Sequence, residues 1–272
     1  MSTAQEPKAY IVTGGGSGIG AATARLLRAR GHDVMVTGRR RSALDAVAAE
    51  TGALARVADA ADPDSADALA HAARAAFGRL DGVVLNAGVM VPGRVGDATD
   101  RDWDAVLATN LTGPFRLLRA TLPALLESRG AVVAVSSVAG LRASAGAAAY
   151  ATSKAGLVML CQTLVADYAA DGLRANTVCP GWVRTEMADT EMADFLAATG
   201  GAEGDREGAY AEVTRLVPQR RAAEPEEAAR VIAWLLSAEA SYVNGAVVTV
   251  DGGATTVDVG TTAYAFEVRP RP

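Results

Sequence analysis

The feature that most constrains this chain is the alternation of short apolar segments with segments of helical periodicity. KAYIVT (8–13), DGVVLNAG (81–88) and GAVVAVSS (130–137) have the length and composition of buried strands. Helical segments such as AATARLLRARG (21–31) separate them, and connections of this kind join parallel strands. The sequence therefore predicts an α/β fold: a single-domain, Rossmann-type, doubly wound sheet of about seven mostly parallel strands with helices on both faces.

The pattern continues along the chain without a linker or an internal repeat, which predicts one domain over residues 1–272. Periodicity weakens over 186–224, which is rich in Gly, Glu and Asp, and a helix is expected over 225–237. We interpret 186–224 as a mobile substrate lid, since long irregular segments inside a compact domain commonly carry function. Residues 254–272 form a C-terminal tail beyond the last expected strand and could reach a neighbouring subunit.

The composition excludes several classes of protein. The formal net charge is −5 and no basic stretch outweighs the acidic ones, so nucleic acid is not an expected partner. No apolar run approaches the roughly 18 residues of a membrane span, and the N-terminus lacks the apolar core of a signal peptide. Cys161 and Cys179 have no metal-ligand spacing, which predicts reduced, buried thiols and no metal. We expect a soluble, cytoplasmic protein.

A glycine-rich stretch, TGGGSGIG (13–20), lies between the first expected strand and the first expected helix. This context makes the motif informative, because glycines there permit a tight turn and let backbone N–H groups and the helix dipole approach a pyrophosphate. A merely flexible turn is the alternative interpretation. The position that discriminates between dinucleotides lies at the end of the second expected strand, where NAD-binding versions carry an acidic residue.

That position holds Gly38, followed by Arg39, Arg40 and Arg41. A carboxylate for the ribose hydroxyls is missing, and a guanidinium suits a 2′-phosphate through bidentate, charge-assisted hydrogen bonds. The sequence thus favours NADP(H) as the cofactor and leaves NAD(H) as the alternative. The other interpretation of the three arginines is a solvated start of the next helix.

Tyr150 and Lys154 stand four positions apart in AYATSKAG (149–156) and therefore share one helix face. A phenol has a usual pKa of about 10, which is too high for a general base at neutral pH because almost none of it is ionised. An ammonium about 4 Å away would favour the phenolate by roughly 4 kcal/mol at an effective dielectric of about 20. We therefore predict that Lys154 lowers the pKa of Tyr150 toward the range of general acid–base catalysis. Ser137, at the carboxyl end of an expected strand, would face the same crevice.

In their order along the chain, these motifs resemble those of the short-chain dehydrogenase/reductase family, across essentially the whole sequence. TGGGSGIG matches its TGxxxGxG, YATSK (150–154) its YxxxK, and TNLTG (109–113) the segment that bears its asparagine. LNAG (85–88) matches NNAG with leucine in place of the first asparagine, and CPGWVRT (179–185) completes the set. Each motif alone is common, whereas the ordered set is highly specific.

The resemblance implies a role for each matching residue. Tyr150 would exchange a proton with the substrate oxygen, and Ser137 would hydrogen-bond and orient that oxygen. Lys154 would also hold the nicotinamide ribose, and Asn110 would support a water chain that connects Lys154 to solvent. The cofactor-binding residues implied besides Tyr150 and Lys154 are Gly14, Ser17, Gly18, Ile19 and Gly20 in the diphosphate loop, Arg39 at the 2′-phosphate, Asp59 at the adenine, Asn86, Ala87 and Gly88 on the adenosine ribose side, and Pro180, Gly181, Val183 and Thr185 at the nicotinamide.

Structural roles stay open for several of these residues. Asn110 could satisfy backbone groups at a helix kink, Asn86 could brace the sheet, and Asp59 could form the turn before Pro63. Ser137 could cap the end of its strand, although its spacing from Tyr150 argues for catalysis.

The resemblance implies an NAD(P)-dependent oxidoreductase that interconverts a ketone and a secondary alcohol by hydride transfer, and a homotetramer packed through the long helices and the C-terminal strand. Trp182 and the lid residues Met187, Met192 and Phe195 suggest a small-molecule substrate that is apolar or cyclic. One alternative is a non-catalytic NADP(H)-binding sensor, which would have no use for the complete set of catalytic residues. Another is a dinucleotide-dependent epimerase or dehydratase, which usually carries a longer C-terminal substrate domain.

Overall fold

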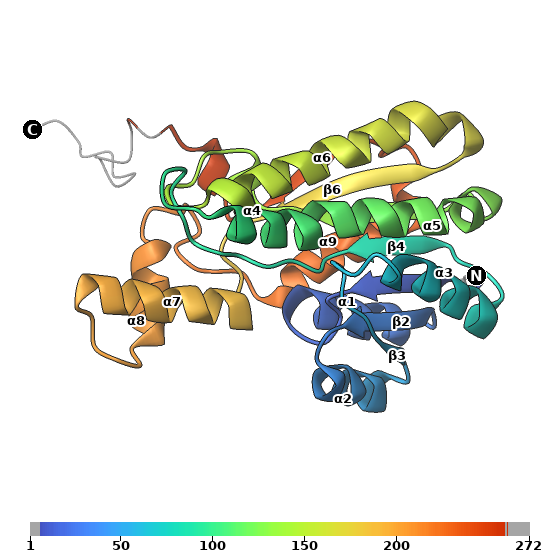
Figure 1. Ribbon diagram of the computed structural model, residues 1–272, viewed down its shortest axis with the longest axis horizontal. Helices are drawn as coiled ribbons and strands as arrows, with labels where there is room; N and C mark the ends of the chain where they lie inside the picture. The colour runs from blue at the N-terminus through green and yellow to red at the C-terminus, as the bar shows by residue number, and fades with distance from the viewer. Residues whose placement is uncertain (1–5, 259, 261–272) are drawn as a thin grey trace, which may run out of the picture.

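The structure is a computed structural model that describes residues 6–258 and 260. The strands of this part of the chain are β1 (Ala9–Thr13), β2 (Asp33–Gly38), β3 (Leu54–Val57), β4 (Gly82–Leu85), β5 (Ala131–Val135), β6 (Arg174–Pro180) and β7 (Val247–Val250). They form one parallel sheet in the order β3-β2-β1-β4-β5-β6-β7 (Figure 1). The predicted parallel sheet is therefore confirmed.

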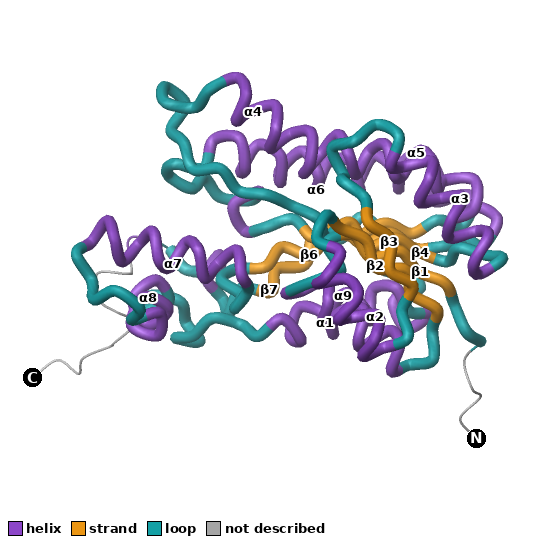
Figure 2. Tube along the Cα trace, turned by 60° about the horizontal axis from the view of Figure 1, so that its bottom comes forward, coloured by secondary structure: helices purple, strands orange, loops and turns teal. Residues whose placement is uncertain are grey.

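Helices cover both faces of the sheet, as a doubly wound fold requires. They are α1 (Gly18–Ala29), α2 (Arg41–Thr51), α3 (Ser65–Phe77), α4 (Asp100–Leu107), α5 (Gly113–Glu127), α6 (Ala148–Tyr168), α7 (Glu186–Thr199), α8 (Arg206–Val213) and α9 (Pro225–Leu236). α3 to α6 lie over one face, α1, α2 and α9 lie over the other, and α7 and α8 lie beyond the end of the sheet (Figure 2). None of the described helices is long and apolar enough to cross a membrane.

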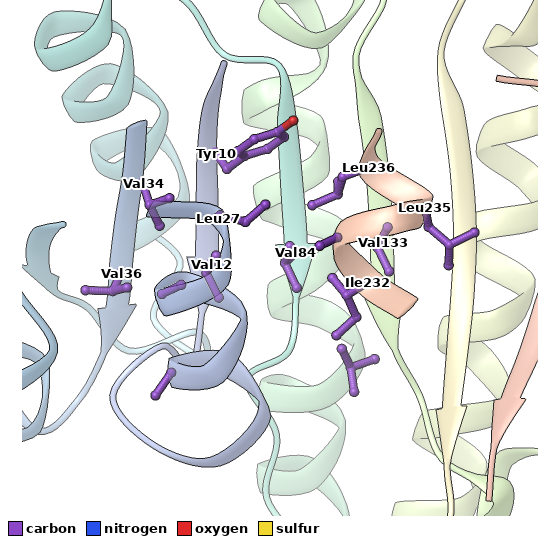
Figure 3. Packing of buried hydrophobic residues seen from close by; sticks show 14 of the residues in the cluster. Tyr10, Val12, Leu27, Val34, Val36, Val84, Val133, Ile232, Leu235 and Leu236 are labelled. Atoms are coloured by element: carbon purple, nitrogen blue, oxygen red, sulfur yellow. The ribbon is translucent and has the colours of Figure 1, made fainter. Parts of the chain in front are cut away.

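The strands are apolar on both sides because both faces of the sheet are covered. Every residue of β1, AYIVT, is buried. Between the sheet and the layer of α1 and α9, Val12, Val36 and Val84 pack with Leu27 and Ile232 (Figure 3). A second cluster joins the opposite face to α3, α5 and α6. These two cores fix the positions of the strand ends, where the site is built.

The strand order creates a crevice between β1 and β4. From β1 the chain proceeds outward through β2 to β3, and it then returns to β4 on the other side of β1. The connections therefore leave the carboxyl ends of β1 and β4 in opposite directions. Ligands of open α/β sheets bind at such a switch point.

Two predicted helix boundaries differ from the structure. The helix expected over 21–31 begins at Gly18, because the last glycines of the loop are already helical. It ends at Ala29, and Gly31 adopts a positive φ of 83° that ends the turn. The helix expected over 225–237 runs over Pro225–Leu236, behind a capping box.

The segment 186–224 contains the helices α7 and α8 rather than an irregular loop. Its periodicity is weak in the sequence because these helices pack on a small cluster of their own, centred on Met192 and Tyr210, instead of on the sheet. A short 3₁₀ turn at Ala254–Thr256 begins the tail, and residues 259 and 261–272 of that tail lie outside the described residues. The role of 186–224 as a lid stays a prediction.

Candidate active site

A cavity of 1140 Å³ lies at the carboxyl ends of the strands and runs from the glycine loop to α7. Most of the predicted site residues line it: Gly14, Ser17, Gly18, Ile19, Arg39, Asp59, Asn86, Ala87, Gly88, Ser137, Tyr150, Lys154, Pro180, Gly181, Val183 and Thr185. Gly20 and Asn110 lie behind its wall. The structure thus brings together residues from segments far apart in the sequence.

The glycine loop packs closely between β1 and the end of β4. Gly14 and Gly18 have φ values of 63° and 52°, and residues other than glycine rarely adopt such positive values. A Cβ on Gly20 would lie 2.3 Å from the carbonyl oxygen of Gly14, so Gly20 permits this packing from behind the cavity wall. Ser17 is the N-cap residue of α1, but its side chain accepts no hydrogen bond from the first N–H groups of that helix.

Asn86 braces this loop, as its structural interpretation predicted. Its Nδ2 donates to the carbonyl oxygens of Thr13, at 2.9 Å, and of Gly14, at 3.2 Å. The hydroxyl of Thr13 in turn accepts hydrogen bonds from the backbone N–H groups of Asn86 and Ala87 and donates to Val84. These bonds hold the ends of β1 and β4 in register at the crevice.

At the adenosine end, the arginines after β2 have different surroundings. Arg39 is exposed on the cavity wall. Arg40 donates to Ser17 Oγ at 3.1 Å and pairs with Glu186 at 2.5 Å, so it links the start of α2 to the start of α7. Asp59 lines the wall and also forms the predicted turn, because its Oδ1 accepts a hydrogen bond from the N–H of residue 61.

These features fit a nicotinamide dinucleotide. Side chains in place of the loop's glycines would clash with neighbouring atoms, so the loop has to be formed by glycine. The N-terminus of α1 lies at the cavity and can bind an anion there. The wall beyond the loop carries a guanidinium at one end and the serine and tyrosine of the expected catalytic set at the other. The cavity is also large enough for such a ligand and a substrate together.

Ser137 and Tyr150 meet at the inner end of the cavity. Ser137 follows β5 in an extended conformation, its Oγ accepts a hydrogen bond from the N–H of Ala139 at 3.1 Å, and it hydrogen-bonds Tyr150 in the first turn of α6. The neighbouring Ser136 donates to the carbonyl oxygen of Lys154 at 2.8 Å and so ties β5 to α6. Ser137 is therefore the serine that contacts the phenol.

Lys154 is buried beneath Tyr150, and its Nζ donates to the carbonyl oxygen of Val135 at 2.8 Å. The Nζ lies 5.6 Å from the centroid of the tyrosine ring. Burial lowers the pKa of Lys154 to about 8. Its side chain thus changes charge near neutral pH.

The prediction that Lys154 lowers the pKa of Tyr150 is wrong for this structure. Burial of the phenol raises the pKa of Tyr150, the hydrogen bond from Ser137 lowers it in part, and the negative charge of Glu191 raises it further. The ammonium of Lys154 is directed at the carbonyl of Val135, so removal of the phenol from water is the larger effect.

Asn110 lies in a single π-helical turn, Ala108–Thr112, that joins α4 to α5. Its Oδ1 accepts from the N–H of Val89 at 2.8 Å, and its Nδ2 donates to the carbonyl oxygen of Val89 and to Ser153 Oγ. The side chain is fully buried and satisfies backbone groups at a helix irregularity, as its structural interpretation predicted. A role of Asn110 in a water chain stays a prediction.

Met187 lines the cavity, as predicted, but the polar side chains on the same face of α7 were not predicted. One face of α7 lines the cavity through Met187, Thr190, Glu191 and Asp194, at the spacing i, i+3, i+4, i+7. Met192 and Phe195 do not line it, because they pack toward α8. Trp182 does line it, as predicted. The helical spacing was the signal that could have separated the two faces.

The chain after β7 closes another side of the cavity. Asp251 accepts hydrogen bonds from the backbone N–H and the hydroxyl of Thr255, at 2.8 and 2.7 Å, and so fixes the short 3₁₀ turn. Ala254 and Val257 of this segment lie on the cavity wall. Sequence patterns alone did not identify this contribution, because the contact is made only when the sheet is assembled.

A family model described as enoyl-(acyl carrier protein) reductase matches residues 14–255. Protein MoaE of Klebsiella aerogenes is 41% identical over 264 residues, which cover 95% of this chain and 99% of that protein. Meso-2,3-butanediol dehydrogenase of Serratia marcescens is 35% identical over 254 residues, which cover 92% of this chain and 96% of that protein.

Among solved structures, a variant of actinorhodin polyketide ketoreductase crystallised with NADPH is similar, with a TM-score of 0.87 and 32% sequence identity. The match covers 94% of this chain and 100% of that chain. These matches extend over nearly the whole length and agree with the ordered motifs and the parallel sheet. The protein therefore belongs to the short-chain dehydrogenase/reductase family.

Proposed function

We propose that the protein is an NAD(P)-dependent oxidoreductase that interconverts a ketone and a secondary alcohol. The observation that carries this proposal is that Ser137, Tyr150 and Lys154 line the same cavity as the glycine loop. A sensor would not need a phenol held by a serine above a buried lysine, and no observation favours an epimerase or a dehydratase.

A dinucleotide bound along the glycine loop would supply the redox chemistry, as the acceptor or donor of the hydride at the reacting carbon. Tyr150 handles the proton: it donates to the carbonyl oxygen in reduction and accepts the hydroxyl proton in oxidation. Ser137 holds the phenol in position and orients the substrate oxygen. Lys154 can pass a proton onward because its pKa of about 8 lies near working pH.

We also propose that the direction in the cell is ketone reduction. This proposal rests on the preference for NADP(H) and therefore on Arg39 and Gly38.

Replacement of Tyr150 tests the proposed reaction. A panel of ketones is offered with NADPH and with NADH, and turnover is followed by the nicotinamide absorbance. Tyr150→Phe should lower kcat by about 100-fold or more, with dinucleotide binding retained, because the proton donor is lost. Tyr242→Phe is the matched control, since Tyr242 is fully exposed. Undiminished turnover by Tyr150→Phe would overturn the scheme.

NADP(H) is the proposed cofactor. Arg39 lies exposed on the cavity wall, the preceding residue is Gly38, and the similar ketoreductase was solved with NADPH. Arg39→Asp should lower kcat/KM for NADPH by about tenfold or more and change that for NADH by less than about threefold. Arg41→Asp is the control, because Arg41 is exposed but does not line the cavity. A wild-type preference for NADH of about tenfold would reverse this choice.

We also propose that the chain acts in the cytoplasm as a homotetramer. The family resemblance supports the assembly, and so do apolar side chains exposed on α4, α5 and α6.

A further inference from the structure

The two faces of α7 differ in what they contact. Met192 is buried in the cluster with α8 and does not line the catalytic cavity, whereas Met187, Glu191 and Asp194 line it. A helix face that borders a substrate pocket determines which substrates the pocket accepts. Here that face presents two carboxylates.

Unlike most other acidic groups of 186–224, these carboxylates have no basic partner among the described residues; Glu203 and Asp205 are the other two exceptions. The acidic side chains at the outside pair with arginines: Glu186 with Arg40, Asp189 with Arg206, and Glu207 and Glu224 with Arg184. Within the described chain, no arginine or lysine forms an ion pair with Glu191 or Asp194. A half-buried carboxylate without a counter-ion costs free energy, and a ligand that supplies the cation removes that cost.

Glu191 also acts on the reaction centre. Its charge is one of the influences that raise the pKa of Tyr150, so its carboxylate is close enough to affect the phenol. The pKa of Glu191 is itself raised, by burial first and by the charge of Asp194 second. Glu191 and Asp194 therefore place negative charge in the same cavity as Ser137 and Tyr150.

The rest of the pocket wall is mainly apolar. Trp182, Met187, Leu216 and Val217 lie on it. The polar residues Gln219, Arg221 and Asp251 also line the cavity, but Arg221 pairs with Glu227 and Asp251 accepts hydrogen bonds from Thr255. An apolar wall with one negatively charged region suits a ligand that has an apolar body and one positive charge. An anionic substrate would meet repulsion from Glu191 close to the reacting atoms.

We infer that Glu191 selects substrates that carry a protonated amine next to the reacting carbon, which makes amino alcohols and amino ketones with an apolar body the preferred substrate class. This inference rests on the proposed oxidoreductase function. The carboxylate would bind the ammonium while Ser137 and Tyr150 bind the neighbouring oxygen. Asp194, which is exposed at the same wall, adds a weaker attraction.

A set of matched alcohols tests this inference in the oxidising direction. 2-Amino-1-phenylethanol carries the amine, 1-phenyl-1,2-ethanediol replaces it by a hydroxyl, and 1-phenyl-1-propanol replaces it by a methyl group. Wild-type kcat/KM should be about tenfold or more higher for the amine than for either neutral alcohol, as expected for a charge-assisted contact. Glu191→Gln should reduce this preference, measured as the ratio of kcat/KM for the amine to kcat/KM for the methyl analogue, to within about threefold.

Glu203→Gln is the matched control, because it removes one negative charge from the same segment at an exposed site. It should leave the amine preference unchanged. A wild-type preference for the diol or the methyl analogue, or an amine preference that survives in Glu191→Gln, would overturn the inference.

Failure of the oxidoreductase proposal would give a different result, namely no turnover of any of the three alcohols. In that case calorimetric binding of 2-amino-1-phenylethanol to the dinucleotide-loaded protein still tests Glu191. Binding that is weakened about tenfold by Glu191→Gln supports the inference, and binding that is equal in the two proteins contradicts it.

Discussion

Lys154 is a cation that the fold encloses almost completely, with 3% of its surface exposed. Its Nζ is held by the carbonyl oxygen of Val135, and no carboxylate of the described chain pairs with it. Such burial destabilises the charged form and therefore the folded protein at neutral pH. Retention of a lysine at this cost agrees with a role in proton transfer beside Tyr150.

This burial makes a prediction about stability and pH. The pKa of Lys154 falls from its usual 10.5 to about 8, so between these values the unfolded chain holds more protons than the folded one. Stability from this group therefore rises as pH increases. Relative to Lys154→Met, wild type should gain about 2 kcal/mol of unfolding free energy between about pH 7 and about pH 10.

Urea unfolding of both proteins at the two pH values measures this gain. The hydrogen bond to Val135 that the variant lacks affects both pH values alike, so it cancels in the comparison. A difference between the two proteins that stays constant with pH would show that the pKa is not lowered.

The π-helical turn between α4 and α5 depends on the side chain of Asn110. Asn110 makes three hydrogen bonds, two to the backbone of Val89 and one to Ser153 in α6. It thereby connects the loop after β4 to two helices. An extra residue in a helical turn is tolerated where a side chain satisfies the groups it displaces.

Asn110→Ala should therefore destabilise the protein by about 2–4 kcal/mol, because the backbone groups of Val89 lose their partners in a buried setting. Denaturant unfolding measures the change. Thr163→Ala removes a hydroxyl from an exposed position of α6 and should change the stability by less than about 0.5 kcal/mol. Equal stabilities of the two variants would contradict this role for Asn110.

The helices α7 and α8 have a hydrophobic cluster separate from the two cores on the sheet. Met192, at 1% exposure, lies in that cluster. Met192→Ala should loosen 186–224 by about 2–4 kcal/mol through the lost contacts and the cavity left behind. Tryptic cleavage at Arg206 and Arg215 should then become faster.

The denaturant midpoint of global unfolding should change little while cleavage within 186–224 becomes faster, because local opening does not require global unfolding. Thr199→Ala, at the exposed end of α7, is the control and should leave the cleavage rate unchanged. If cleavage outside 186–224 became faster in equal proportion, the segment would be part of the main core rather than a lid.

For the molecule as a whole, the sequence predicted the parallel sheet because a strand buried on both faces and a helix with one apolar face leave clear patterns. It predicted that Ser137 and Tyr150 line the cavity, because Ser137 directly follows a strand and Tyr150 lies in the first turn of the next long helix. It did not predict the charge balance at Tyr150, which depends on burial and on Glu191 from a distant segment. Such effects arise only in three dimensions.

The exposed apolar side chains make the last prediction, on assembly. Trp103 in α4, Phe115 in α5 and Met159 in α6 have exposures of 37%, 47% and 61%, on helices that lie over one face of the sheet (Figure 2). Trp234 in α9 and the fully exposed Tyr242 lie at a separate place. Exposed apolar side chains on neighbouring helices are typical of interfaces between subunits.

Two distinct interfaces with twofold symmetry generate a tetramer, so light scattering should give the mass of four chains of 27.7 kDa each. The double change Phe115→Glu and Met159→Glu should break one interface and leave dimers, because it buries charge without partners. Asp45→Glu, on the exposed face of α2, is the control and should leave the tetramer intact. A wild-type protein with the mass of one chain would contradict the proposed assembly. The catalytic cavity would then have to function within a single subunit.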